Sequence, residues 1–295
     1  MGRTESEGAL DESGGGDGPR PTSASLDRVE DREARRRTAP RAAVVYEAIR
    51  REGEDELGRP TSALFFSGLA AGLSMGFSLV AEGLLRAMLP DAPWRPLVSK
   101  LGYSVGFLIV ILGRQQLFTE NTLTPVLPLL RRQRGVTLAH VLRLWGVVLA
   151  SNLIGTLVFA WMIGRTDAFD PTVRAVFASL GAEALHAAGP GTIIVRGIFA
   201  GWLIALMVWL LPFAETARVW VIVILTYLIG IAQLPHIIAG SVETLYLVTT
   251  GAASVGEYLG RFFLPALAGN VIGGLALVTA INHAQVVSGD SGAEA

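Results

Sequence analysis

Leu117–Asn121 (LFTEN) and Leu234–His236 (LPH) interrupt two long hydrophobic segments of this chain, and a similar motif follows each interruption. The motif reads ASNLIG at 150–155 and AGNVIG at 268–273. Its asparagine lies 33 residues after the threonine of the first interruption and 34 residues after the histidine of the second. Unrelated stretches rarely share such spacing, so the sequence predicts an internal duplication. Interrupted helices in both halves of a duplicated membrane protein are typical of a transport site near the bilayer midplane.

The composition places most of the chain in a membrane. Hydrophobic residues make up 51% of the sequence, and the mean hydropathy is +0.49. Residues 1–59 hold 25 of the 49 charged side chains, so the other 236 residues carry only 24, too few for a soluble domain of that size. The chain has no cysteine, which excludes disulfides and cysteine-ligated metals. Since the sequence also lacks HExxH, a phosphate loop and a nucleophile–base set, we expect no cofactor, no metal and no enzymatic activity.

Six stretches are long enough to cross a hydrocarbon core of about 30 Å, which takes roughly 20 helical residues. We therefore expect an all-α membrane domain over residues 59–285, built as an inverted repeat of three plus three transmembrane helices. The second and fifth stretches carry the interruptions. GLAAG at 68–72 and GIFAG at 197–201 extend the repeat to the first and fourth stretches, and small residues at this spacing favour close helix packing. The predicted stretches are 61–89, 97–130, 141–163, 192–211, 219–251 and 258–281.

Residues 1–58 form a predicted cytoplasmic extension. The first 40 residues are rich in glycine, serine, proline and charge and are expected to be disordered. Apolar residues at helical spacing predict a short amphipathic helix near 42–57. Residues 286–295 are expected to form a disordered tail. Positive loops tend to stay in the cytoplasm, and placing both termini there leaves nine basic residues inside against five outside. The expected location is the inner membrane.

The two interruptions offer different chemistry. Half-helices that begin at the midplane point unsatisfied N–H groups into the gap and favour an anion there. Thr119 offers a hydroxyl group, while Leu117 and Phe118 offer apolar side chains that can close a constriction. His236 is the one histidine well inside a hydrophobic stretch, and Pro235 before it disfavours continued helix. An ionisable side chain at such a position predicts a functional role, because it is costly in a membrane.

Three ordered motifs resemble the formate/nitrite transporter family over residues 60–285. QLFTEN at 116–121 is similar to the family's loop in the broken second helix, and RGI at 196–198 followed by VW at 208–209 is similar to its fourth-helix motif. His236 falls at the family's central histidine. The resemblance implies an aquaporin-like protomer of six helices with broken helices 2 and 5, assembled as a homopentamer with a pore in each subunit. It also implies conduction of small monovalent anions such as formate, nitrite or hydrosulfide.

The same resemblance implies roles for individual residues. Thr119 and His236 would share the central site. An anion cannot cross an apolar slit as a charge, because its desolvation is prohibitive. Protonation at or near the imidazole would let the neutral acid pass, so that anion and proton move together. The residues implied to form the apolar gate and the remaining constriction are Leu117, Phe118, Tyr103, Phe107 and Ile229.

The chain also departs from the family's pattern. Gly201 stands in the fourth helix where many members place an asparagine that faces the histidine, and 183–186 (EALH) lacks the lysine that commonly precedes that helix. Around the histidine the chain reads PHI at 235–237 and AG at 239–240, in place of EHS and AN. These departures indicate a divergent branch.

Several charged residues lie inside the hydrophobic stretches and need partners. We expect Arg114 to pair with Glu120 or Glu243, either beside the pore or as a brace that holds the loops and never meets substrate. Glu82 and Arg86, one helical turn apart, are expected to form a simple surface pair.

Other functions remain as alternatives. A neutral-solute channel of the aquaporin type shares the half-helix geometry, although the interruptions here lack Asn-Pro-Ala repeats. A non-transporting membrane scaffold is the second alternative. Nucleic-acid binding is not expected, because acidic residues interrupt the basic runs. The expected partners are a small anion, a proton, the lipid bilayer and further copies of the chain.

Overall fold

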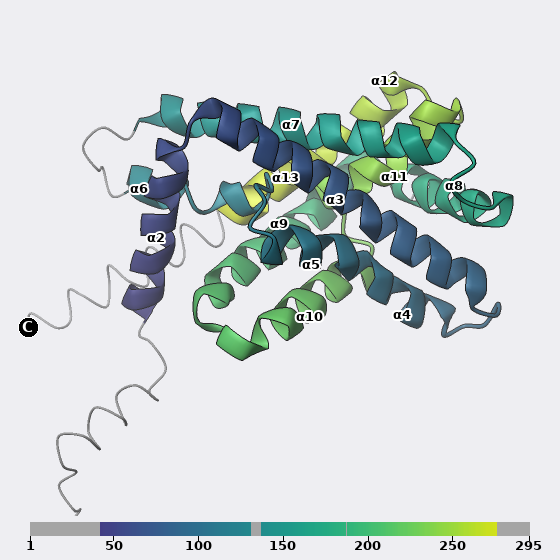
Figure 1. Ribbon diagram of the computed structural model, residues 1–295, viewed down its shortest axis with the longest axis horizontal. Coiled ribbons are helices and arrows are strands. Elements are labelled where there is room, and N and C mark those ends of the chain that lie inside the picture. Colours follow the sequence, from purple (N-terminus) through teal and green to yellow (C-terminus); the bar gives the residue numbers. More distant parts are fainter. Residues whose placement is uncertain (1–41, 131–136, 187, 276–295) are drawn as a thin grey trace, which may run out of the picture. The chain divides into compact units, whose positions relative to one another are not determined.

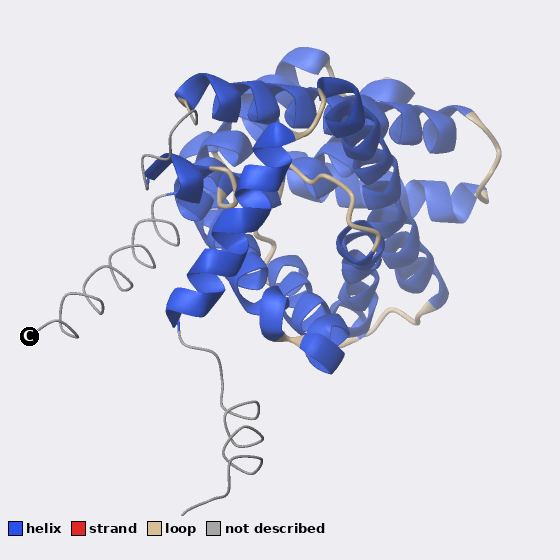
Figure 2. Ribbon diagram, turned by 60° about the vertical axis from the view of Figure 1, so that its left-hand side comes forward, coloured by secondary structure: helices blue, strands red, loops and turns tan. Residues whose placement is uncertain are grey.

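A computed structural model describes residues 42–130, 137–186 and 188–275, and in these ranges every regular element is a helix (Figures 1 and 2). The predictions for residues 1–41 and for the tail at 286–295 lie outside the described residues. Four stretches in the described ranges are long and apolar enough to cross a membrane: Thr61–Met88, Arg95–Leu112, Leu138–Arg165 and Pro190–Phe213. The predicted all-α class is confirmed for the described part of the chain.

The first, third and fourth predicted stretches agree with helices α3, α7 and α9 within three residues at each end. The α-helices are α2 (Ala42–Gly58), α3 (Thr61–Met88), α4 (Arg95–Ser99), α5 (Ser104–Leu112), α6 (Val126–Leu130), α7 (Leu138–Arg165), α8 (Pro171–His186), α9 (Pro190–Leu210), α10 (Arg218–Ile231), α11 (Ile237–Thr250), α12 (Val255–Glu257) and α13 (Leu264–Ile272). The shorter elements are the 3-10 helices η1 (Lys100–Tyr103), η2 (Glu120–Thr122), η3 (Leu211–Phe213) and η4 (Glu215–Ala217), and the π-helix η5 (Tyr258–Phe263).

The sequence did not indicate helix α8. Its residues Val173, Phe177, Leu180 and Leu185 are buried at helical spacing, and the helix packs against α11 and α3. At 16 residues α8 is shorter than a membrane crossing needs. The length criterion for a membrane crossing therefore does not detect α8, and its residues are interpreted as a loop.

Both interrupted segments leave a helix by the same kind of backbone turn. α5 ends at Leu112 and α10 ends at Ile231. Arg114 and Gln233 follow two residues later, with φ values of 50° and 52°. This left-handed region costs a residue with a side chain about 1 to 2 kcal/mol. Both segments carry this conformational cost at the same distance from the end of a helix. We infer that contacts in the surrounding structure hold both turns.

Glycines allow two pairs of helices to approach closely at corresponding positions. A Cβ atom on Gly72 of α3 would collide with the carbonyl oxygen of Asn152 on α7. A Cβ atom on Gly201 of α9 would collide with the carbonyl oxygen of Asn270 on α13. The predicted close packing is therefore confirmed. Gly201 faces the backbone of α13, so the interpretation of this position as one facing the histidine is wrong; sequence spacing alone does not fix the direction in which a helical residue points.

Helix α2 packs against one end of the helical body, beside α6 (Figure 1). It occupies the range in which the sequence predicts an amphipathic helix. Its apolar side enters a small buried cluster with residues of the 120s and of α9. The members of this cluster are Val45, Tyr46, Ile49, Leu123, Leu127, Ala205 and Val208.

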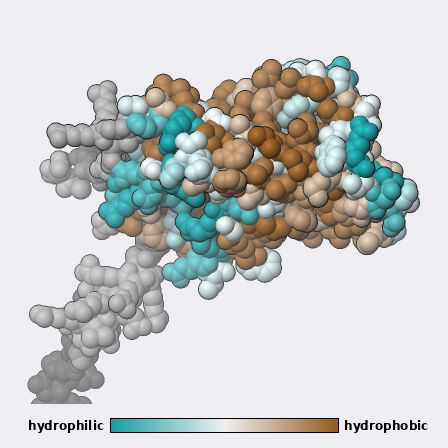
Figure 3. Space-filling model, turned by 45° about the horizontal axis from the view of Figure 1, so that its top comes forward, coloured by the Kyte–Doolittle hydropathy of each residue, from teal (hydrophilic) through white to brown (hydrophobic). Residues whose placement is uncertain are grey.

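Large apolar side chains also remain on the outside of the body. Figure 3 shows broad apolar zones on the visible face, with hydrophilic residues gathered toward its left and right ends. Exposed apolar area of this extent is typical of surfaces that face lipid or another subunit. The exposed residues include Phe66, Trp161, Phe199, Trp220 and Ile224.

Candidate functional site

A buried asparagine ties the first interrupted segment to two helices. Oδ1 of Asn152, on α7, accepts a hydrogen bond from the backbone N–H of Phe118 at 2.9 Å. Nδ2 donates to the carbonyl oxygens of Gln116 at 2.9 Å and of Gly68 on α3 at 2.7 Å. The Asn152 side chain therefore satisfies three backbone groups in the buried interior, where unpaired polar groups are costly.

A second asparagine does the same for the second segment. Oδ1 of Asn270, on α13, accepts from the backbone N–H of Ile237 at 2.8 Å. Nδ2 donates to the carbonyl oxygens of Pro235 at 2.8 Å and of Gly197 on α9 at 3.0 Å. These partners correspond one for one to those of Asn152. The similar spacing in the sequence thus follows from the need to satisfy equivalent backbone groups in the two interrupted segments.

The two interrupted segments meet at Thr119 and His236. Oγ1 of Thr119 lies 2.7 Å from Nε2 of His236, and both side chains are buried. Nδ1 of His236 accepts a hydrogen bond from the backbone N–H of Ala239 at 3.2 Å, which caps the start of α11. Because Nδ1 accepts, a neutral imidazole carries its proton on Nε2 and donates it to Thr119. The threonine hydroxyl keeps its own proton, which it can donate to a third group.

Apolar side chains surround this pair. The ring of Phe107 lies edge-on against the imidazole with the ring centroids 4.9 Å apart, and the Tyr103 ring follows at 5.4 Å from Phe107. Ile229 is fully buried nearby and belongs to the same apolar cluster. The structure therefore brings these three predicted constriction residues together around His236.

The two predicted gate residues lie directly before Thr119, and both are buried in the main apolar cluster. Leu117 is fully buried in the main apolar cluster. Phe118 packs its ring edge-on against Trp145 of α7, with the centroids 6.0 Å apart. The indole N–H of Trp145 donates to the carbonyl oxygen of Asn121 at 2.7 Å. Phe118 is thus anchored on α7, and the segment is fixed on both sides of Thr119.

Two cavities lie at opposite ends of the helices that surround this apolar layer. α9 contributes Arg196 to one cavity and Val208, twelve residues later, to the other. The larger one, which we call the α2 cavity, has a volume of about 650 Å³. It lies against α2 and is rich in both signs of charge. Its charged residues are Arg51, Glu52, Asp55, Glu56, Arg59, Arg114, Glu120 and Arg218.

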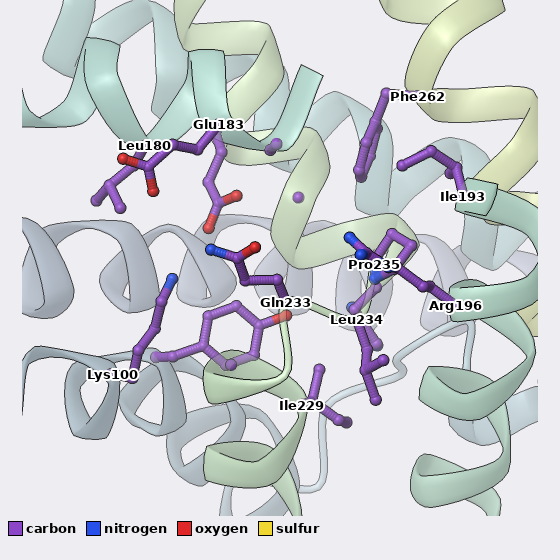
Figure 4. Close-up of a pocket in the computed structure, with 16 residues that line it drawn as sticks. Lys100, Leu180, Glu183, Ile193, Arg196, Ile229, Gln233, Leu234, Pro235 and Phe262 are labelled. Atoms are coloured by element: carbon purple, nitrogen blue, oxygen red, sulfur yellow. The ribbon is translucent and has the colours of Figure 1, made fainter. Parts of the chain in front are cut away.

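The smaller cavity, which we call the lysine cavity, has a volume of about 70 Å³ and reaches His236. Tyr103 and Ile229 form part of its wall. Figure 4 shows the side chains of Lys100, Glu183, Arg196 and Gln233 converging on this space from different elements. Among the polar residues that line it are Lys100, Tyr103, Glu183, Arg196, Gln233, His236 and Glu243.

The predicted partner of Arg114 is wrong. Arg114 is 71% exposed and its guanidinium group lies 3.0 Å from the carboxylate of Glu52 on α2. Glu120 lines the same α2 cavity, whereas Glu243 lines the lysine cavity at the other end. The left-handed turn at Arg114 redirects the chain, so neighbours along a regular helix no longer predict contacts there.

The predicted surface pair of Glu82 and Arg86 is wrong as well. Glu82 is fully buried, and its Oε1 lies 2.5 Å from Nζ of Lys100. Arg86 holds Glu183 on α8 through two hydrogen bonds of 3.0 and 2.6 Å. Glu82 and Arg86 are each paired with a residue on a segment distant in sequence. Helical spacing does not reveal such pairs.

Lys100 and Gln233 are polar residues of the lysine cavity that sequence reasoning missed. The segment 183–186 before the fourth helix has no lysine, and Lys100 reaches the cavity from η1 instead. One signal was present in the sequence: Lys100 is the single lysine of the chain and lies inside a predicted crossing.

Comparison with solved structures identifies the fold. The structure is similar to a pentameric formate channel with formate bound and to an FNT family ion channel, each with a TM-score of 0.65 and 19% identity. The first match covers 77% of this chain and 98% of that channel, and the second covers 81% and 94%. At this level of identity the likeness shows the fold alone.

Comparison of sequences identifies the family. Inner membrane protein YfdC of Escherichia coli (strain K12) is 42% identical over 250 residues, which are 85% of this chain and 80% of that protein. Formate channel BtFdhC of Bacillus thuringiensis is 26% identical over 250 residues, 79% of this chain and 91% of that channel. The formate/nitrite transporter family model matches residues 43–284. Members of this family are channels and transporters, not enzymes. The match of the family model and the identity to YfdC show that the chain belongs to the formate/nitrite transporter family.

Proposed function

We propose that this chain conducts small monovalent weak-acid anions, such as formate or nitrite, across the inner membrane, each anion together with a proton. The observation that carries the proposal is the contact between Thr119 and His236, held in an apolar layer between two cavities. The names of two relatives, a formate channel and an inner membrane protein, support the substrate class and the location.

The proposal includes six membrane crossings in each subunit, arranged as an inverted repeat. The segments from α4 to α6 and from α10 to α11 would be the broken second and fifth crossings. The equivalent hydrogen bonds of Asn152 and Asn270 support two equivalent halves. Both termini would lie in the cytoplasm, so that the α2 cavity faces the cytoplasm and the lysine cavity faces outward. We propose a homopentamer, because a similar structure is a pentameric channel.

The apolar layer decides the form in which a substrate passes. An anion in the lysine cavity meets the cations Lys100 and Arg196. Beyond them lie Phe107 and the other apolar side chains packed around His236, which offer a charge no compensation. A neutral acid crosses such a layer at far lower cost, so proton and anion would have to combine before they enter it.

The central pair would then serve the neutral acid as a hydrogen-bonding station. Nε2 of His236 donates to Thr119, which leaves the threonine hydroxyl to donate to an oxygen of the acid. A second proton on the imidazole would break the hydrogen bond between Nδ1 and the Ala239 N–H. His236 would therefore orient the Thr119 hydroxyl while remaining neutral itself.

Flux into proteoliposomes that contain a pH-sensitive dye tests this function. Purified protein is supplied with inward gradients of formate, nitrite, hydrosulfide or glycerol, and protein-free vesicles control for diffusion through lipid. Formate or nitrite should acidify the interior faster than in the control vesicles, and His236→Asn should slow this acidification. Rapid glycerol flux with no change of internal pH would instead favour a neutral-solute channel. A His236→Asn variant with the wild-type rate would remove the histidine from the mechanism.

A further inference from the structure

Glu243 stands apart from the other carboxylates around the lysine cavity. It lies on α11, seven residues after His236, which is two helical turns or about 10 Å along the helix axis. Its side chain is half-buried and lines the cavity. Among the described residues it has neither a hydrogen-bond partner nor an ion-pair partner, so it braces no neighbouring element.

Four of the charged groups near Glu243 are matched in two pairs. Lys100 on η1 is paired with the buried Glu82 of α3 at 2.5 Å. Glu183 on α8 is paired with Arg86 of α3 at 2.6 Å. The remaining groups around the cavity are Arg196 on α9, whose side chain has no partner among the described residues, the neutral Tyr103 and Gln233, and His236.

The protonation state of Glu243 therefore determines the net charge around the lysine cavity. With Glu243 ionised, its charge balances that of Arg196, and an entering anion meets no excess positive charge. With Glu243 protonated, Arg196 is the unmatched group and the cavity carries an excess positive charge. The second state attracts an anion, and it already holds the proton that the anion needs.

We propose that Glu243 is the proton-exchange residue of this pathway, at which a weak-acid anion receives its proton before it enters the apolar layer. The inference rests on the proposed function and names the residue that serves it. A hydronium ion that reaches the lysine cavity gives up a proton by breaking one of its O–H bonds, the proton forms an O–H bond on the Glu243 carboxylate, and a water molecule is left. The anion then binds beside Arg196 and Lys100, the O–H bond breaks, and the proton passes to the anion. Glu243 returns to its carboxylate form, so one anion and one proton leave the cavity as a neutral acid.

The dependence of transport on external pH tests this assignment. Initial rates of formate uptake into proteoliposomes, corrected for protein-free vesicles, give KM and the maximal rate at external pH 6, 7 and 8. For wild-type protein we expect KM to rise more than twofold between pH 6 and 8, because Glu243 loses its proton as the pH increases. For Glu243→Gln we expect KM to change less than twofold over this range, with a maximal rate at least tenfold lower, because the cavity stays positive but lacks the proton donor.

Glu183→Gln is the matched control, because it also removes one carboxylate from the same cavity. It should shift KM at every pH and leave the steep pH dependence intact. An equal loss of pH dependence in both variants would attribute the effect to the overall charge of the cavity and overturn the proposal. Glu243→Asp keeps a carboxyl group and should keep the pH dependence at a reduced maximal rate. If Glu243→Gln does not assemble, Glu243→Ala with the wild-type pH dependence would overturn the proposal.

Two failures are distinguishable in this experiment. A Glu243→Gln variant with the wild-type pH profile, in vesicles where wild-type protein acidifies the interior, would overturn the role of Glu243 alone. Wild-type protein that takes up formate without acidification would contradict the proposed function, and the role of Glu243 with it.

Discussion

Replacing Asn270 with alanine removes the three side-chain hydrogen bonds by which α13 holds the second interrupted segment and α9. The N–H of Ile237 and the carbonyl oxygens of Pro235 and Gly197 lose their partner together. The site is fully buried, so water does not readily replace the amide. Such bonds contribute about 1 kcal/mol each in soluble proteins and about 0.6 kcal/mol each in a membrane protein. We expect the free energy of unfolding to fall by about 2 to 3 kcal/mol.

Denaturant unfolding of the detergent-solubilised protein, followed by tryptophan fluorescence, measures this loss. Ser151→Ala is the matched control: Ser151 is equally buried, but its hydroxyl group donates only to Val148 of its own helix. We expect a loss below about 1 kcal/mol for the control, the common net value of one hydrogen bond. Asn152→Ala should resemble Asn270→Ala, because its three partners are equivalent. A loss for Asn270→Ala within about 0.5 kcal/mol of the control would show that these bonds do not hold the segment in place.

Three further predictions concern the central site, the buried ion pair and α2. Thr119→Val keeps the side-chain shape but removes the hydroxyl, so formate flux should fall about tenfold, the effect of one lost hydrogen bond; wild-type flux would exclude Thr119 from the pathway. Lys100→Met leaves the buried Glu82 unpaired and should lower the free energy of unfolding by about 3 to 5 kcal/mol. Adding Glu82→Gln to Lys100→Met should restore most of the lost free energy of unfolding. A double variant as unstable as Lys100→Met would contradict the pairing. Burial raises the pKa of Glu56 from 4.5 to about 6, so its stabilisation of the folded state is complete below pH 4.5 and is lost as the pH rises through 6. Glu56→Gln should therefore unfold like wild type at pH 4.5 and be about 1 to 2 kcal/mol more stable at pH 7, and a difference that stays constant with pH would count against this explanation.

The sequence predicted the parts of the site that follow from local backbone chemistry. An interruption in a buried helix leaves N–H and C=O groups that need partners, and Asn152 and Asn270 supply them. The same motif therefore recurs in both halves, and its recurrence is what indicates the duplication. The meeting of Thr119 and His236 was likewise expected, because the family's motifs place them in the two interrupted segments.

The parts that sequence reasoning missed depend on contacts between distant segments. Lys100 finds Glu82 because η1 packs against α3, and Ser78 of α3 donates to the carbonyl oxygen of Tyr103 at 2.6 Å. Arg86 finds Glu183 on α8, a helix too short to appear in a search for crossings. No helical periodicity encodes these pairings. Arg114 was assigned wrongly because its left-handed backbone ends the periodicity on which the assignment relied.

Coupled movement of anion and proton is measured by the ratio of protons to anions that enter vesicles through the wild-type protein. Proteoliposomes that hold a pH-sensitive dye take up radiolabelled formate, with and without an imposed membrane potential. We expect one proton for each formate and an initial rate that does not depend on the potential, because the species that crosses the apolar layer is neutral. Formate uptake without acidification, at a rate that follows the membrane potential, would contradict the coupling.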